Sequence, residues 1–265
     1  MALRALVRAP GPRLAEGLVT HIERSGTVDT DRARQQWEAY CQALAAAGFE
    51  LTEVDPAPEH PDSVFVEDAL LTVGDLAVVT APGARERRDE VNGARVAAHR
   101  LGLETVEVAD GHRGDHDEPV RLDGGDVLAI GSTLHVGVGG RTTRAGATAL
   151  GRLVADVGRR VEVVPISQTL HLKSQVTALP DGTVVGYPPL VDDPSRWPSF
   201  AEVPEAEGAH VVVLDDATVL MSDAAPRSAD LFRARGLDVV ALDVSEFVKL
   251  EGCVTCLSVR LHPYD

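Results

Sequence analysis

Aromatic residues are scarce in this sequence, at 4% of its 265 residues, although hydrophobic residues reach 44%. The hydrophobic core is therefore predicted to consist mainly of Val, Leu and Ala. A chain of this length buries roughly 70–75% of the surface that it exposes when unfolded. A stable core is expected without disulfides.

Cysteine is also scarce, and the count of three is odd. An odd number argues against a framework of disulfides, and unpaired thiols are typical of the reducing cytoplasm. The first residues, MALRALVRAPGPRL, lack the apolar segment of a signal peptide. No stretch approaches the ~20 apolar residues of a transmembrane helix. We therefore expect a cytoplasmic protein.

Basic residues are outnumbered by acidic ones, 25 to 41, which gives a formal net charge of −16. Such a charge repels the phosphates of nucleic acids and anionic membrane surfaces. The predicted partners therefore include neither nucleic acid nor membrane. Positively charged small molecules are favoured.

One order of elements recurs along the chain: two short strands, an amphipathic helix and a third strand. The clearest copies cover residues 64–109 and 125–166. In the second copy a helix is predicted over 143–157, because apolar residues from Leu150 to Val157 follow helical spacing. A third copy starts at His171, but its helix region, 188–200, contains four prolines and is predicted to be a loop. A fourth copy starts near His210.

The fifth copy is divided between the two ends of the sequence. Residues 253–261 are predicted to form a strand that pairs with residues 3–9, followed by a helix over 31–47 and a strand over 49–54. Repeats that close on themselves are typical of a propeller-like ring or a solenoid. A doubly wound α/β sheet is the alternative, but it has one strand for each helix. No linker divides the chain, so residues 1–265 are predicted to form one domain.

Reactive side chains occur near the start of the first strand of several copies. They are Glu67 and Asp68, the pair Asp123 and Asp126, His171, and Cys256. In a ring these starts converge on the centre. A cysteine, a histidine and carboxylates at one place can perform nucleophilic catalysis.

Cys256 belongs to the segment Cys253-Val-Thr-Cys256, which allows three interpretations. It could be a nucleophile, a buried core residue, or part of a redox or metal-binding pair. Residues three apart in a strand face opposite sides. Because we place this segment in a strand, the two thiols are predicted neither to bond to each other nor to bind one metal. Cys41 is expected to pack on the buried face of its helix.

The other candidates also have ordinary interpretations. Glu67 and Asp68 interrupt the apolar run VFVEDALL, where buried carboxylates are costly unless they are paired. They mark either an exposed strand end or a site for a cationic ligand. His171 could be a satisfied surface residue. The segment 123–126 could be a simple turn, although its glycines would allow a close approach of the backbone to a site.

Six segments, in order along nearly the whole chain, resemble the dimethylarginine dimethylaminohydrolase family: GLVTH, VFVEDA, LDGGDVL, GGRTT, LHLKS and SEFVKLEGCVTCLSVRL. The resemblance implies a five-bladed α/β propeller of ββαβ units, the pentein fold. It implies hydrolysis of asymmetric dimethylarginine and monomethylarginine to citrulline through a covalent cysteine intermediate, with no metal or organic cofactor. A homodimer is compatible with it. Arginine deiminase and other guanidine hydrolases or amidinotransferases of the same fold are alternatives. A redox or metal protein built on Cys253 and Cys256 is a further alternative.

The resemblance also implies roles for individual residues. Cys256 matches the nucleophile, His171 the general acid and base, and Asp123 the carboxylate that orients the histidine, where some members carry Glu. The implied substrate contacts are Asp62, Glu67 and Asp68 with the cationic groups, Arg87 and Arg141 with the α-carboxylate, and the carbonyls of Leu18 and Leu250 with the α-amine. Arg85 and Arg88 compete with Arg87 for its assignment. Loop 10–21 matches a mobile lid.

Overall fold

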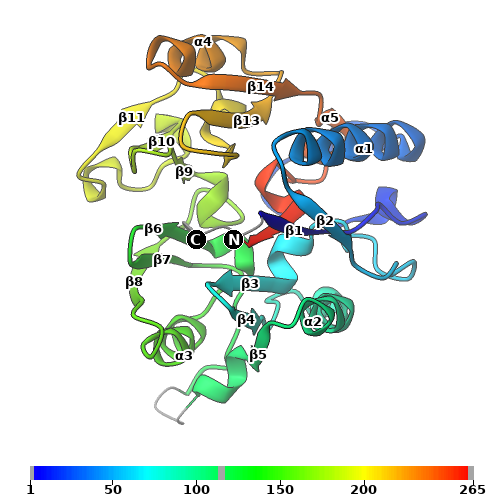
Figure 1. The fold of residues 1–265 in the computed structure, drawn as a ribbon, viewed down its shortest axis with the longest axis vertical. Helices are drawn as coiled ribbons and strands as arrows, with labels where there is room; N and C mark the ends of the chain where they lie inside the picture. Colours follow the sequence, from blue (N-terminus) through cyan, green and yellow to red (C-terminus); the bar gives the residue numbers. More distant parts are fainter. Residues whose placement is uncertain (1–2, 113–116, 262–265) are drawn as a thin grey trace.

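Five three-stranded sheets surround a common centre in the computed structural model, which describes residues 3–112 and 117–261 (Figure 1). In each sheet the first two strands are antiparallel and the third runs parallel to the second. From the inner strand outwards, the sheets are β15 (Ser258–Leu261), β1 (Arg4–Val7) and β2 (Glu50–Glu53); β3 (Leu70–Val73), β4 (Leu76–Val79) and β5 (Glu104–Glu107); β6 (Val127–Ile130), β7 (Thr133–Val138) and β8 (Arg160–Pro165); β9 (Val176–Ala178), β10 (Val184–Gly186) and β11 (Phe200–Glu202); and β12 (Val211–Val213), β13 (Thr218–Ser222) and β14 (Asp238–Leu242).

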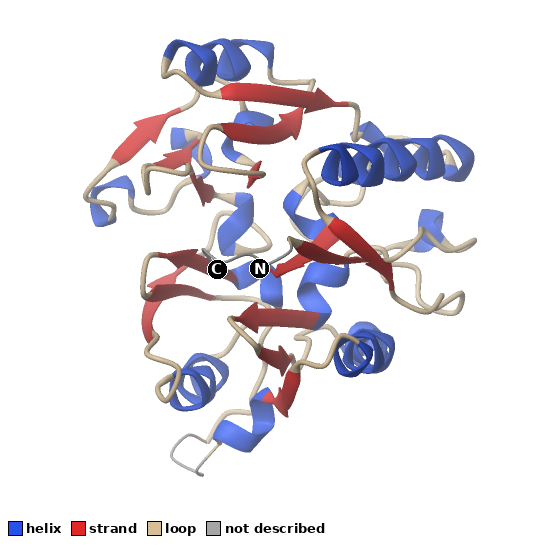
Figure 2. Ribbon diagram, in the orientation of Figure 1, coloured by secondary structure: helices blue, strands red, loops and turns tan. Residues whose placement is uncertain are grey.

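In four of the sheets an α-helix connects the two parallel strands. These helices are α1 (Thr30–Ala46), α2 (Val91–Arg100), α3 (Arg144–Val154) and α4 (Pro226–Ala234), and a short helix α5 (Ser245–Val248) follows β14. Figure 2 shows the long helices outside the ring of strands. In the sheet of β9, β10 and β11 the described connection contains two 3-10 turns, Pro188–Leu190 and Pro194–Arg196, in place of an α-helix. The prediction of a loop there is confirmed, and proline accounts for it because it lacks the N–H that a helix interior needs.

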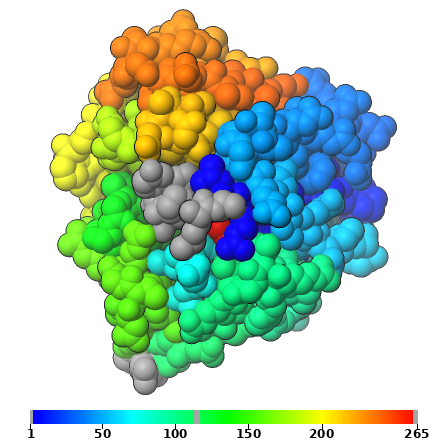
Figure 3. Space-filling model, in the orientation of Figure 1, coloured from blue at the N-terminus to red at the C-terminus, as the bar shows by residue number. Residues whose placement is uncertain are grey.

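The ring closes through the two ends of the chain. Strand β1 pairs antiparallel with β15, with Leu6 opposite Val259. The sequence passes around the molecule in order, as the colours of Figure 3 show. Five separate sheets confirm the pentein-type propeller and exclude one doubly wound sheet. No helix in the described part of the chain is long and apolar enough to cross a membrane.

The buried residues are mainly Val, Leu and Ala, as the composition predicts. Helix α1 begins at its cap Asp29, whose carboxylate accepts hydrogen bonds from the backbone of Asp31 and Arg32. Its inner face buries Trp37, Tyr40 and Leu44, whereas Cys41 is half-buried and Ala45 is exposed. Helix α3 ends earlier than predicted, at Val154, so Val157 lies beyond it and is 47% exposed.

The inner strands are shorter than the sequence predicts. The first strand of the predicted copy at residues 64–109 begins as a 3-10 turn, Val66–Ala69, and becomes β3 only at Leu70. The predicted strand at 253–261 likewise contains a turn, Thr255–Leu257, before β15. These turns occur where polar or reactive residues interrupt the apolar pattern, and they form the site described next.

Candidate active site

A 3-10 turn precedes the inner strand of each sheet. The five turns are Val66–Ala69, Gly124–Asp126, Leu172–Ser174, Ala206–Ala209 and Thr255–Leu257. The turn Val66–Ala69 packs against Thr255–Leu257 on one side and against Gly124–Asp126 on the other. Gly124–Asp126 packs in turn against Leu172–Ser174. Four of the turns, with the residues that precede them, supply the predicted cysteine, histidine and inner carboxylates, and Ala206–Ala209 supplies none. The repeat therefore brings residues that are far apart in the sequence to one place.

His171 and Asp123 form a buried pair. Nε2 of His171 lies 3.0 Å from Oδ2 of Asp123. Asp123 is fully buried and His171 is 3% exposed. The other carboxylate oxygen of Asp123, Oδ1, accepts a hydrogen bond of 2.7 Å from the backbone N–H of Gly83. Both carboxylate oxygens are therefore held, and one of them fixes the orientation of the imidazole.

Three carboxylates surround His171. Burial lowers the pKa of the imidazole, but Asp68, Asp126 and Asp123 outweigh this effect and raise the pKa to about 9. Burial raises the pKa of Asp126 to about 7. Asp126 holds the backbone next to the histidine, because its Oδ1 accepts the N–H of Leu172 at 3.0 Å. At neutral pH His171 is an imidazolium that can donate a proton.

Glycines at residues 124 and 125 allow this close packing. A Cβ atom on Gly124 would lie 1.9 Å from the carbonyl oxygen of Glu67, and one on Gly125 would lie 2.6 Å from Nδ1 of His171. Only glycine fits at either position. The predicted close approach of this segment to a site is confirmed.

The two cysteines of Cys253-Val-Thr-Cys256 face each other, which corrects the sequence-based prediction. Their sulfur atoms are 3.4 Å apart, and both side chains are buried. The prediction was wrong because it assumed a strand, whereas the backbone turns here, with the N–H of Cys256 donating to the carbonyl of Cys253 at 3.2 Å. The hydrogen bond that the Cys256 thiol donates to Cys253, burial and the carboxylates of Glu67 and Asp68 raise the pKa of Cys256 above its ordinary value.

Glu67 and Asp68 are adjacent but point to different partners. Oε1 of Glu67 pairs with Nζ of Lys173 at 2.6 Å, and its Oε2 has no hydrogen-bond partner among the described residues. Oδ1 of Asp68 accepts the N–H of Gly125 and lies 3.8 Å from Nδ1 of His171. Asp68 is therefore the carboxylate that faces the histidine.

Arg87 and Arg141 occupy different environments. Of the three neighbouring arginines, Arg87 alone is buried, whereas Arg85 and Arg88 are exposed. Its guanidinium is already engaged, with Oδ2 of Asp68 at 2.5 Å, both Nε and Nη2 on Oε2 of Glu90, and Nη2 also on two backbone carbonyls. Nη1 of Arg141 lies 3.6 Å from Oδ2 of Asp123 and has no hydrogen-bond partner within the described chain, although it is buried. Arg141 thus has a donor directed into the site. Arg87 could bind a ligand only if it gave up one of its present hydrogen bonds to the protein.

Two carboxylates hold the loop that contains Leu18. The backbone N–H of Leu18 lies 3.1 Å from Oδ1 of Asp62 and 3.2 Å from Oδ2. Oε1 of Glu251 accepts the N–H of Ile22 at 2.8 Å and also that of His21, and its Oε2 accepts the N–H of Thr20 at 2.9 Å. A Cβ on Gly17 would lie 3.3 Å from the side chain of Leu250, so the loop also packs on that residue.

Comparison with known proteins agrees with this geometry. A protein-family model described as arginine deiminase matches residues 20–204. A dimethylarginine dimethylaminohydrolase of Streptomyces coelicolor is 54% identical over 263 residues, which cover 99% of this chain and 98% of that protein. This chain belongs to the dimethylarginine dimethylaminohydrolase family. A solved structure of the Pseudomonas aeruginosa family member, a mutant complexed with citrulline, has a TM-score of 0.87 at 28% identity and covers 98% of this chain and 99% of its own. Another, a dimethylarginine dimethylaminohydrolase adduct with S-methyl-L-thiocitrulline, has a TM-score of 0.88 at 27% identity and covers 98% of this chain and 100% of its own.

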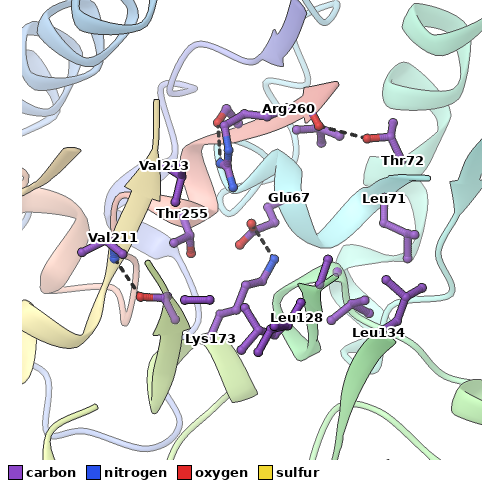
Figure 4. A pocket seen from close by; sticks show the side chains of 18 of the residues that line it. Glu67, Leu71, Thr72, Leu128, Leu134, Lys173, Val211, Val213, Thr255 and Arg260 are labelled. Carbon is purple, nitrogen blue, oxygen red and sulfur yellow. Dashed lines mark hydrogen bonds and ion pairs between the residues drawn. The ribbon is translucent and has the colours of Figure 1, made fainter. Parts of the chain in front are cut away.

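The cluster of Cys256, His171 and Asp123 is separate from a cavity at the centre of the ring. This cavity of about 360 Å³ is lined by residues from the inner strand of every sheet, together with Glu67, Lys173 and Thr255 (Figure 4). Cys256, His171 and Asp123 are not among its described lining residues. The Glu67–Lys173 ion pair faces the cavity in Figure 4, so the turn Val66–Ala69 contributes Glu67 to the cavity and Asp68 to the surroundings of His171.

A cation could be held by Asp68, Asp123 and His171, whose ligand atoms lie within 4.8 Å of one another. These atoms already make ion pairs with Arg87, Arg141 and each other. A guanidinium group is positively charged like a metal ion, and it also donates hydrogen bonds to carboxylates.

Two functional contacts escaped the sequence analysis. Thr142 donates to Oδ2 of Asp126 at 2.6 Å and accepts the backbone N–H of Asp123 at 3.1 Å, so it links the carboxylate of Asp126 to the backbone of Asp123. Its place in the GGRTT segment is a signal that could have found it. Glu251 holds the loop, and its place after Leu250 in the segment SEFVKLEGCVTCLSVRL is a signal that could have found it. It is the one described non-glycine residue with a positive φ, at 61°.

Proposed function

We propose that this protein hydrolyses asymmetric dimethylarginine and monomethylarginine to citrulline, with release of dimethylamine or methylamine. The position of Asp68 carries the proposal. Its carboxylate lies 3.8 Å from Nδ1 of His171 and is close enough to Cys256 to raise the pKa of that thiol. A guanidinium beside Asp68 would therefore lie between a nucleophile and a proton donor. The family relationship and the neighbouring structures with citrulline support this substrate class.

The first chemical step depends on the charge of the substrate. Without substrate, the hydrogen bond to Cys253, burial and nearby negative charges favour the protonated form of the Cys256 thiol, because they raise its pKa. A bound guanidinium cation offsets the charges of Asp68 and Glu67 and so favours the thiolate. The thiolate attacks the central guanidinium carbon and gives a tetrahedral adduct. Asp62 and Asp68 hold the cationic groups of the substrate.

His171 performs both proton transfers. Its Nε2–H donates to Asp123, which leaves Nδ1, on the side of Asp68, as the atom that gives up a proton. The imidazolium protonates the leaving dimethylamine, and a thiouronium remains on Cys256. Neutral His171 then takes a proton from water, whose oxygen attacks the same carbon. Collapse of the second adduct releases citrulline and the thiolate. General acid–base catalysis of this kind contributes about 10²–10⁴-fold in rate.

The amino-acid end of the substrate lies toward Arg141 and the loop. The unbonded buried Nη1 of Arg141 is a donor for the α-carboxylate, and Arg87 joins it if it exchanges one of its protein acceptors. The carbonyls of Leu18 and Leu250 accept from the α-ammonium. Because His171 and Cys256 are 3% and 7% exposed, loop 10–21 must open to admit the substrate.

The proposal takes residues 1–265 as one catalytic domain, because the nucleophile follows the last helix and its strand closes the first sheet. A cytoplasmic location agrees with the three free thiols, since a reactive cysteine persists in a reducing compartment. A homodimer stays a prediction, which sedimentation of the purified protein would check.

A citrulline assay tests the function. Arginine, monomethylarginine and asymmetric dimethylarginine are compared side by side, with Cys256→Ser as the control. We expect turnover of both methylated substrates, little from arginine, and none in the variant. Faster turnover of arginine would assign the protein to the deiminases instead, and activity retained in Cys256→Ser would overturn the role of the nucleophile.

A further inference from the structure

Cys253 and Cys256 occupy the ends of one tight turn. Their sulfur atoms are 3.4 Å apart, and the N–H of Cys256 donates to the carbonyl of Cys253. In a four-residue turn the first and last Cα atoms are less than about 7 Å apart. Disulfides need a Cα separation of roughly 4.4–6.8 Å. The sulfur atoms can therefore come within bonding distance by rotation of the side chains and little movement of the backbone.

We propose that Cys253 is a resolving thiol, which forms a reversible disulfide with Cys256 when the site reacts with a hydroperoxide. The proposal rests on the proposed function, in which Cys256 is the nucleophile. It assigns to this turn a site of reversible oxidation that switches off hydrolysis of methylated arginine.

The chemistry balances in two steps. A thiolate sulfur of the pair attacks one oxygen of the peroxide, the O–O bond breaks, and the oxygen that leaves takes a proton and departs as water or alcohol. The attacking sulfur keeps the other oxygen, as a hydroxyl group, and becomes a sulfenic acid. The second sulfur then attacks the sulfenic sulfur, the S–O bond breaks, and the hydroxyl leaves as water with the proton of the second thiol. The peroxide is reduced, the two thiols are oxidised, and the product is the same whichever sulfur reacts first.

The position of Cys253 determines the fate of the sulfenic acid. A sulfenic acid without a neighbouring thiol is oxidised further to sulfinic acid, which is irreversible for most proteins. Here the second thiol is already in contact, and only Thr255 and Cys256 are polar partners of the Cys253 sulfur among its described hydrogen bonds. The same contact lowers the pKa of Cys253 below that of an ordinary cysteine, so one sulfur of the pair is available as a thiolate.

Cys41 provides a matched control. It is the third free cysteine, is half-buried on helix α1, and packs against the edge of the core cluster. Burial raises the pKa of its thiol to about 12. It is therefore expected to react slowly with peroxide and to have no part in the disulfide.

Peptide mapping after peroxide treatment tests the proposal. The protein is exposed to hydrogen peroxide, its remaining thiols are alkylated, and it is digested with trypsin. Cleavage after Lys249 and Arg260 gives one peptide, residues 250–260, that contains both cysteines. We expect this peptide to escape alkylation and to be lighter than the reduced form by two hydrogen atoms. Dithiothreitol should restore both thiols and the citrulline-forming activity.

Two variants make the result specific. In Cys253→Ser no disulfide can form, so Cys256 should be recovered either alkylated or with added oxygen, and dithiothreitol should restore little of any activity that peroxide removes. Cys41→Ser should behave as the unchanged protein. Oxygen addition at Cys256 without a disulfide in the unchanged protein would overturn the proposal, as would equal recovery in Cys253→Ser. The peptide mass does not depend on turnover, so a protein that forms the disulfide but acts on no methylated arginine would overturn only the proposed function.

Discussion

Oδ2 of Asp123 lies 3.0 Å from Nε2 of His171 and 3.6 Å from Nη1 of Arg141. One carboxylate oxygen thus faces both the histidine that would transfer protons and the arginine that would bind the substrate. Because the oxygen is fully buried, its charge is weakly screened by solvent. In the proposed mechanism, the orientation of the imidazole and the binding of the amino-acid end of the substrate therefore depend on the same group.

Replacement of Asp123 should change the proton affinity of His171. In Asp123→Asn the imidazole loses a charged acceptor, so its pKa falls and its orientation is less fixed. We expect kcat/KM for dimethylarginine to fall about 100-fold or more, with its basic limb displaced to lower pH. A pH–rate profile measures both. Asp123→Glu keeps the carboxylate and should retain more activity than Asn, and equal profiles for the two variants would contradict the role of the charge.

Removal of His171 should stop the reaction either before the covalent intermediate forms on Cys256 or before that intermediate is hydrolysed. In His171→Ala no group protonates the leaving amine or activates water, so turnover should be lost. Intact-mass measurement after mixing with substrate would detect an adduct on Cys256, which should be absent in the double variant with Cys256→Ser. Full activity of His171→Ala would be incompatible with the mechanism.

Loss of the Arg141 side chain should weaken binding of substrates that have an α-carboxylate. A hydrogen bond to a charged group contributes about 1.5–3 kcal/mol, so KM in Arg141→Ala should rise roughly 10- to 100-fold. Agmatine, which has the guanidinium but no carboxylate, can be compared as a competitive inhibitor. Its inhibition constant should change little, whereas a parallel loss for both ligands would indicate a general disturbance of the site.

Glu251 should control the order of the loop. Glu251→Ala removes the acceptor for the backbone of Thr20, His21 and Ile22. Hydrogen exchange at these amides should become faster, and KM should rise because the closed loop is less stable. Glu23→Ala, an exposed change in the same loop, is the matched control. Unchanged exchange in Glu251→Ala would show that packing on Leu250 is sufficient to hold the loop.

The stability of the protein should depend on the charge of His171. Folding raises the pKa of His171 from 6.5 to about 9, so the folded state favours the protonated form. This contribution is fully present below about pH 6.5 and is lost as the pH rises through about 9. The free energy of unfolding in urea, compared between the unchanged protein and His171→Gln, should show a difference that shrinks on the order of 3 kcal/mol over this interval. A difference that stays constant with pH would contradict the assignment.

The sequence predicts the ring well and its centre less well. Strand pairs, helices and the closure of the ends follow from apolar periodicity, which governs elements that bury one face. The turns before β3 and β15 do not follow from it, because residues such as Glu67 and Cys256 stand in apolar segments that have the composition of a strand. The contact between Cys253 and Cys256 was therefore missed. Arg87 was placed in the site by resemblance, but its engagement by Glu90 and Asp68 depends on side chains whose packing no local pattern records.

The pairing of β1 with β15 has a consequence for the order in which the protein matures. Asp123 and His171 lie in the middle of the chain, whereas Cys256 lies two residues before the strand that completes the first sheet. A nascent chain can build most of its blades while the thiol is still unmade or held in the ribosome. Docking of β15 on β1 therefore closes the ring of sheets and also brings Cys256 beside the other residues of the candidate site.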